Sequence, residues 1–109
     1  MREFSLRLVP AAILCFLAVS TVAAAQSDAA GLFKANCVLC HAADGSGSSA
    51  AGKALKAKDL RSPEVQKESD ATLAEVITKG KGKMTAFGAK IKPDDVTKLV
   101  AYVRTLGKK

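Results

Sequence analysis

Aromatic residues are scarce in this chain of 109 residues, which has no tryptophan, one tyrosine and four phenylalanines. The sequence also lacks internal repeats and the alternation of β-branched and polar residues that marks β-strands. Its length leaves room for one domain and excludes doubly wound dinucleotide-binding enzymes and barrel enzymes. A domain this small seldom holds a stable core unaided, so we expect a further cross-link or bound group to stabilise it.

The amino terminus is typical of a secretory signal peptide. Two arginines accompany an almost entirely apolar stretch at residues 8–22, and three alanines at 23–25 supply the small residues of a cleavage site. We therefore expect a signal peptide at residues 1–25 and a mature domain at 26–109, periplasmic or secreted and without stable membrane insertion. The apolar stretch is at the short end for a spanning helix, which leaves an uncleaved anchor as the alternative.

Helical signals dominate the mature segment. We expect a first helix over residues 27–38, capped by its leading serine or aspartate. A short helix should follow residues 62–64, where proline takes the first helical position. Asp70 is a suitable cap for a further helix that ends at Gly80.

The last helix is the most clearly marked. Pro93 fits its first position, and the two aspartates that follow suit the positive end of the helix dipole. Apolar residues recur at spacings of three and four and form one stripe: Val96, Leu99, Val100, Val103 and Leu106. The predicted fold class is all-α, with three longer helices, one short helix and long loops at residues 44–52 and 81–89. Loops of that length in a compact domain suggest that they surround another group.

Residues 37–41 read Cys-Val-Leu-Cys-His. Two cysteines at this spacing on a helix end can each form a thioether with a vinyl group of one haem, and the histidine that follows then lies under the iron. Signal cleavage would remove Cys15, which leaves Cys37 and Cys40 as the cysteines of the mature domain. We predict one covalently attached haem c, held by Cys37 and Cys40, with His41 as an axial iron ligand.

Three other interpretations of these two cysteines remain open. A thioredoxin-like redox pair requires a βαβ setting, and the sequence predicts no strands. A zinc site requires four ligands, whereas residues 26–109 offer two cysteines and one histidine. A disulfide between Cys37 and Cys40 would close only a very short loop.

The mature segment offers one candidate for the second axial ligand. His41 is its only histidine, and Met84 is its only methionine because Met1 leaves with the signal. A thioether suits low-spin iron, and a His/Met pair raises the reduction potential. Met84 lies in a loop rich in glycine and lysine, off any apolar stripe, so core packing explains it poorly. We predict that His41 and Met84 ligate the iron.

With these features the chain resembles the small monohaem class I cytochromes c of bacterial periplasms. The resemblance covers nearly all of the mature segment and rests on the cysteine motif, the stretch around Met84 and a final helix containing the sequence Val-Ala-Tyr-Val-Arg at 100–104. It implies the cytochrome c fold around one covalently bound haem, and an electron carrier that is not an enzyme. It also implies that the first and last helices cross, with Phe33 and Tyr102 packed around Gly31.

Two positions depart from the pattern of that family. Thr85 follows Met84, where the family often has proline. Many members also have a proline downstream of the haem histidine whose carbonyl accepts the ring N–H, and no proline occurs between His41 and Ser62. We expect a backbone carbonyl near Gly52 to take this role, since a ligating imidazole usually donates its other N–H.

Lysines flank Met84 in a chain whose formal net charge is +7. Residues 79–92 contain no acidic residue and five lysines: Lys79, Lys81, Lys83, Lys90 and Lys92. If Met84 binds the iron, this segment lies near the haem edge and can attract the acidic face of a redox protein partner. Nucleic acid is not an expected partner, because the chain carries an export signal and only Phe87 interleaves the lysines.

The predicted function is a soluble periplasmic electron carrier, monomeric, that cycles one electron on a His/Met-ligated haem. One alternative is a haem subunit fixed to a larger membrane or periplasmic oxidoreductase. The other is an open-site haem protein that binds peroxide or gas ligands, although a peroxidase-type site would use a distal histidine or arginine and no second histidine remains.

Overall fold

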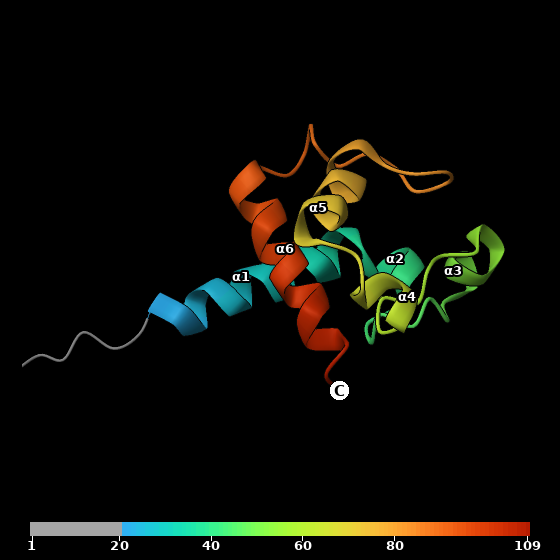
Figure 1. Cartoon of the computed structure of the whole chain (residues 1–109), viewed down its shortest axis with the longest axis horizontal. Coiled ribbons are helices and arrows are strands. Elements are labelled where there is room, and N and C mark those ends of the chain that lie inside the picture. Colours follow the sequence, from blue (N-terminus) through green and yellow to red (C-terminus); the bar gives the residue numbers. More distant parts are fainter. Residues whose placement is uncertain (1–20) are drawn as a thin grey trace, which may run out of the picture.

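The computed structural model describes residues 21–109 of the chain. This part contains six helices: α1 (Thr21–Asn36), α2 (Val38–His41), α3 (Ala50–Leu55), α4 (Pro63–Gln66), α5 (Asp70–Lys79) and α6 (Pro93–Leu106). Its only β-type pairing is an isolated bridge between Lys81 and Met84. In Figure 1, α6 crosses α1 near the middle of the molecule, and α2, α3 and α4 lie toward one end. The predicted all-α class is confirmed.

The three longer helices of the prediction are α1, α5 and α6, but residues 21–109 hold three short helices instead of one. The expected short helix is α4, which Ser62 caps with its hydroxyl and in which Pro63 occupies the first turn. The sequence predicts only loop at 44–52, yet α3 begins within it. The hydroxyl of Ser49 accepts a hydrogen bond from the Gly52 N–H and so caps α3.

Both ends of α1 differ from the prediction. The helix begins at Thr21, so neither Ser27 nor Asp28 caps it, and it ends at Asn36 instead of running to residue 38. The alanines before Gln26 are strong helix formers, which explains why the helix starts early. The Asn36 side chain donates to the Leu32 carbonyl at 2.9 Å, and α2 follows as a separate turn.

The predicted signal peptide lies mostly outside the described residues and stays a prediction. Among the helices of residues 21–109, none combines the length and the apolar character that crossing a membrane requires.

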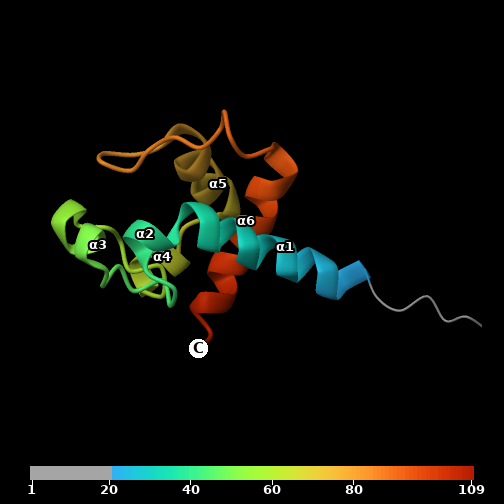
Figure 2. The same cartoon turned by 180° about the vertical axis from the view of Figure 1, so that it is seen from behind.

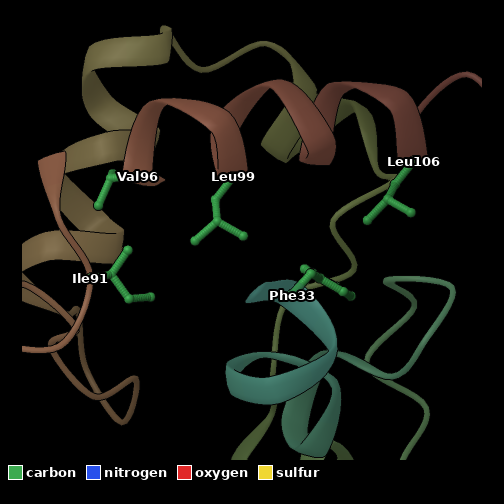
Figure 3. Close-up of a cluster of buried hydrophobic side chains, with 5 residues drawn as sticks. All are labelled: Phe33, Ile91, Val96, Leu99 and Leu106. Carbon is green, nitrogen blue, oxygen red and sulfur yellow. The ribbon is translucent and has the colours of Figure 1, made fainter. Parts of the chain in front are cut away.

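α6 supplies most of the core, as its apolar stripe predicts. All five stripe residues are buried, and Pro93 with two aspartates forms the first turn. Phe33 of α1 and Ile91, just before α6, join three of them in one cluster. Figure 3 shows Leu99 and Leu106 pointing from α6 toward α1, where Phe33 lies.

The crossing of α1 and α6 includes an aromatic pair. The ring centroids of Phe33 and Tyr102 are 5.0 Å apart, which confirms the packing that the family resemblance implies. The expected role of Gly31 is wrong, because this glycine is exposed and a Cβ added there meets no heavy atom within 4 Å. The buried small residue is Ala29, which is 4% exposed and stands one helical turn before Phe33.

α5 begins one residue away from the predicted cap. Ser69 is the N-cap, and its hydroxyl accepts the Thr72 N–H, whereas Asp70 is the first helical residue. Arg104 of α6 donates to the Asp70 carboxylate at 2.9 Å and to the Gln66 carbonyl at 2.8 Å. These bonds tie the last turns of α6 to α4 and to the start of α5.

Candidate haem-attachment site

The three motif residues meet on the single turn of α2. The backbone N–H groups of Cys40 and His41 both donate to the Cys37 carbonyl, at 3.3 and 2.9 Å. Both cysteines are free thiols of intermediate exposure. Burial, and to a smaller extent the charge of nearby Cys40, raises the pKa of Cys37 to about 11. Burial therefore disfavours the thiolate form of a free Cys37 side chain.

The ring of His41 is held by a backbone carbonyl. Its Nδ1 lies 3.0 Å from the carbonyl oxygen of Lys58. A carbonyl oxygen can only accept, so Nδ1 carries the proton and the lone pair of Nε2 is available to a metal. The expected kind of acceptor is correct but its position is not, because Lys58 lies beyond the Gly52 region in the loop that returns toward α4.

The backbone carbonyls of the motif are held by residues 47–52. Gly47 donates its N–H to the His41 carbonyl at 2.8 Å. The Ser49 hydroxyl lies 2.7 Å from the Leu39 carbonyl and 3.1 Å from that of Cys40. Gly52 is buried against the Cys40 carbonyl so closely that any Cβ would collide with it. The sequence did not predict the Ser49 contacts, because they join residues nine and ten positions apart in the chain.

An ion-pair network braces the segment next to Lys58. The Arg61 guanidinium donates to Asp59 at 3.0 Å and lies 3.6 Å from the Asp44 carboxylate. Hydrogen bonds from Arg61 lower the pKa of Asp59. The pKa of Asp44 is also lowered, chiefly by hydrogen bonds from Ser46 and in smaller part by Arg61. The two ends of the segment that joins α2 to α4, and that contains α3, are thereby linked.

Met84 is half-buried on the loop between α5 and α6. The Met84 N–H donates to the Lys81 carbonyl at 3.0 Å, and the Lys81 N–H to the Met84 carbonyl at 3.3 Å. Gly80 has a φ of 75°, and a Cβ there would lie 2.5 Å from the Met84 carbonyl oxygen. The loop is fastened to α5 by the N–H groups of Phe87 and Gly88. In Figures 1 and 2 it extends toward the same end of the molecule as α2 and α3.

The five lysines of residues 79–92 are all exposed. Lys79 pairs with Glu75 at 3.2 Å. Within residues 28–109, the other four make no ion pair.

The residues around the motif fit a large apolar group with an iron centre. The two thiols are the groups that covalent haem attachment requires, and the imidazole nitrogen is suited to ligate the iron. Cys37 packs against the core cluster, as do half-buried apolar side chains from several other segments, which include Leu32, Val38, Leu60, Ile77 and Phe87. The described residues contain no group of three histidine, cysteine or acidic side chains that could hold a bare metal ion, which disfavours the zinc interpretation.

Comparisons with known proteins find several relatives of this chain. The family described as cytochrome c oxidase, cbb3-type, subunit III matches residues 24–103. Cytochrome c6 from Nostoc sp. (strain PCC 7120 / SAG 25.82 / UTEX 2576) is 40% identical over 106 residues, which cover 96% of this chain and 91% of that protein. The cbb3-type cytochrome c oxidase subunit FixP of Azorhizobium caulinodans is 35% identical over 85 residues, which cover 76% of this chain and 28% of FixP.

A solved structure shows the same arrangement of helices. The KustC0563 c-type cytochrome superimposes with a TM-score of 0.67 and 33% sequence identity, over 72% of this chain and 96% of that one.

Proposed function

Because the chain belongs to the small monohaem class I c-type cytochromes, electron-transfer proteins that carry covalently bound haem c, we propose that it is a periplasmic electron carrier with His41 and Met84 as axial iron ligands. Cys37 and Cys40 would hold the haem through thioethers. Bound haem c supplies an iron atom that accepts one electron from a reduced donor and returns it to an oxidised acceptor.

One observation carries the proposal: the hydrogen bond between His41 Nδ1 and the Lys58 carbonyl, at 3.0 Å. It fixes the ring tautomer and its orientation, so Nε2 is presented as a ligand before any metal arrives. The surrounding carbonyl contacts hold the turn itself. A carrier benefits from such rigidity, because little has to move when one electron is gained or lost.

Met84 is the proposed second ligand. The two hydrogen bonds with Lys81 and the close approach of Gly80 fix its backbone, and it is the sole methionine of residues 26–109. With His41 and Met84 both holding the iron, no ligand position would be left for a substrate, as a carrier requires.

A redox titration of the haem-containing protein with optical spectra tests this function. We expect a single one-electron transition, low-spin spectra in both oxidation states and a sulfur-to-iron charge-transfer band in the ferric form. Rapid carbon monoxide binding by the ferrous protein at neutral pH would favour the open-site alternative instead.

The exposed lysines support docking to an acidic partner. Four of the five have no ion pair within residues 28–109, so their charge is available to steer an encounter. The ferrous protein should reduce hexacyanoferrate(III), a small anion, more slowly as the salt concentration rises. At low salt, the Lys81→Glu and Lys83→Glu variants should react more slowly than the wild type. Lys108→Glu is a control beyond α6, outside residues 79–92. Equal effects of all three substitutions would contradict a localised docking face.

The family description favours one second candidate, a haem subunit of a larger oxidoreductase. The carrier is the better-supported reading, because the chain spans 91% of its cytochrome c6 relative and 28% of FixP. Amino-terminal sequencing of the protein from periplasmic extract should give Gln26 as the first residue. Recovery only from membranes, with residues 1–25 retained, would support the fixed subunit.

A further inference from the structure

Gly47, in the loop between α2 and α3, lies between the backbone of His41 and the Ala57–Lys58 segment. Its N–H donates to the His41 carbonyl at 2.8 Å. Its α-carbon faces the Ala57–Lys58 segment, so that a Cβ at position 47 would lie 2.7 Å from the Ala57 oxygen and 3.5 Å from the Lys58 oxygen. Gly47 is buried and has a φ of 74°, in the left-handed region.

The Ala57–Lys58 segment is the one that binds the histidine ring, because the Lys58 carbonyl accepts the His41 Nδ1–H. Two backbone hydrogen bonds return the segment toward α2: Ala57 N–H to the Gly52 carbonyl and Leu60 N–H to the Gly45 carbonyl, both at 2.8 Å. The segment therefore has little freedom to move aside without weakening one of these bonds. Any side chain at position 47 would push against it.

We propose that Gly47 is a positioning residue for His41: having no side chain, it lets the Lys58 carbonyl come close enough to hold the ring N–H. This inference rests on the proposed function, in which His41 is the iron ligand. A weaker N–H···O bond makes the imidazole a poorer donor, and a poorer donor stabilises ferric iron less. Gly47 thus acts on the iron through a peptide carbonyl, without touching the ligand ring.

The experiment compares the haem-containing Gly47→Ala and Gly47→Asn variants with the wild type. Both add a Cβ, but asparagine tolerates a left-handed φ better than alanine does, so Gly47→Asn keeps the test usable if Gly47→Ala fails to fold. In both variants we expect hydrogen exchange of the His41 ring N–H, followed by NMR in the ferrous state, to become about tenfold faster or more. The reduction potential should move in the positive direction.

Gly82→Ala is the matched control. Gly82 also has a positive φ, of 58°, but a Cβ there meets nothing within 4 Å. Gly82→Ala should lower the stability through a strained backbone while leaving the exchange rate of the His41 ring N–H unchanged. Equal ring exchange in the wild type and both Gly47 variants would overturn the inference. A wild-type protein whose spectra show no histidine on the iron would instead overturn the proposed function.

Discussion

The rings of Phe33 and Tyr102 pack at 5.0 Å with their planes inclined by 47°, and they join α1 to α6. Phe33 is 2% exposed, whereas Tyr102 is only partly buried. A tilted pair at this distance has a favourable quadrupole interaction in addition to the apolar area that it buries. The pair therefore links the two helices specifically, beyond general core packing.

A double-mutant cycle measures this link. Phe33→Leu and Tyr102→Leu should each lower the free energy of unfolding of the haem-containing protein, with a coupling energy of about 0.5–1.5 kcal/mol between them. Denaturant unfolding followed by circular dichroism gives all four values. Tyr102→Phe keeps the ring and should keep most of the coupling, whereas strictly additive effects would show that the rings do not interact.

Substitutions at Gly31 and Ala29 should act in opposite directions. Gly31→Ala adds a methyl group where nothing lies within 4 Å, so it should raise the free energy of unfolding by up to about 1 kcal/mol through helix propensity. Ala29→Leu overfills a position of α1 that is 4% exposed and should lower the free energy of unfolding by about 1–3 kcal/mol. Thermal unfolding of both variants measures these changes. If Gly31→Ala lowered the stability, Gly31 would after all be in close contact at the crossing of α1 and α6.

Arg104 should contribute more to the free energy of unfolding than an exposed cation with a single partner does. Its side chain is 25% exposed and binds both Asp70 and the Gln66 carbonyl, so Arg104→Ala should lower the free energy of unfolding by about 1.5–3 kcal/mol. Lys79→Ala removes a pair whose side chains are 72% and 62% exposed and should change it by about 0.5 kcal/mol or less. Urea unfolding of both variants measures these changes. Similar losses of unfolding free energy in Arg104→Ala and Lys79→Ala would contradict the larger contribution of Arg104.

The ion pairs of Arg61 with Asp44 and Asp59 predict that the stability of the protein falls at acid pH. Asp44 and Asp59 have lowered pKa values in the folded protein, so their contribution is complete above the ordinary aspartate pKa of about 3.9. It is lost as the pH falls through the lower folded-state pKa values. Arg61→Met raises these values toward normal and should move the acid unfolding midpoint to higher pH. Lys53→Met removes the same charge from α3 and should shift the midpoint less.

Met84→Ala tests the second ligand directly. Loss of the thioether should lower the reduction potential substantially, because a His/Met pair favours the ferrous state. The variant should also bind carbon monoxide readily in the ferrous form while keeping its covalent haem. Optical spectra and redox titration follow both changes, and an unchanged potential with an unchanged spectrum would mean that Met84 is not on the iron.

Features encoded within a few residues are the ones that the sequence predicts well. Pro93 and the apolar stripe define α6, and Ser62 with Pro63 defines the start of α4, because caps and helix periodicity are local. The attachment motif is equally local, which is why it could be recognised.

Features that depend on chain closure escaped prediction. Lys58 becomes the acceptor of the His41 N–H only because the loop turns back through bonds to Gly45 and Gly52. Ser49 caps α3 while it contacts the carbonyls of α2, and no spacing rule connects these residues. Ala29 is buried and Gly31 is exposed, and two small residues so close together give no periodic signal from which this difference could be predicted.

The distance along the chain between α2 and α6 has a consequence for the order of assembly. Five of the nine buried hydrophobic residues described lie on α6, so the core cannot close before α6 docks. The α2 turn needs only neighbouring residues for its own hydrogen bonds, and such contacts form far sooner than those between distant segments. Before α6 docks, the two thiols would thus lie on a preformed turn in an otherwise open chain, accessible to the machinery that attaches a prosthetic group.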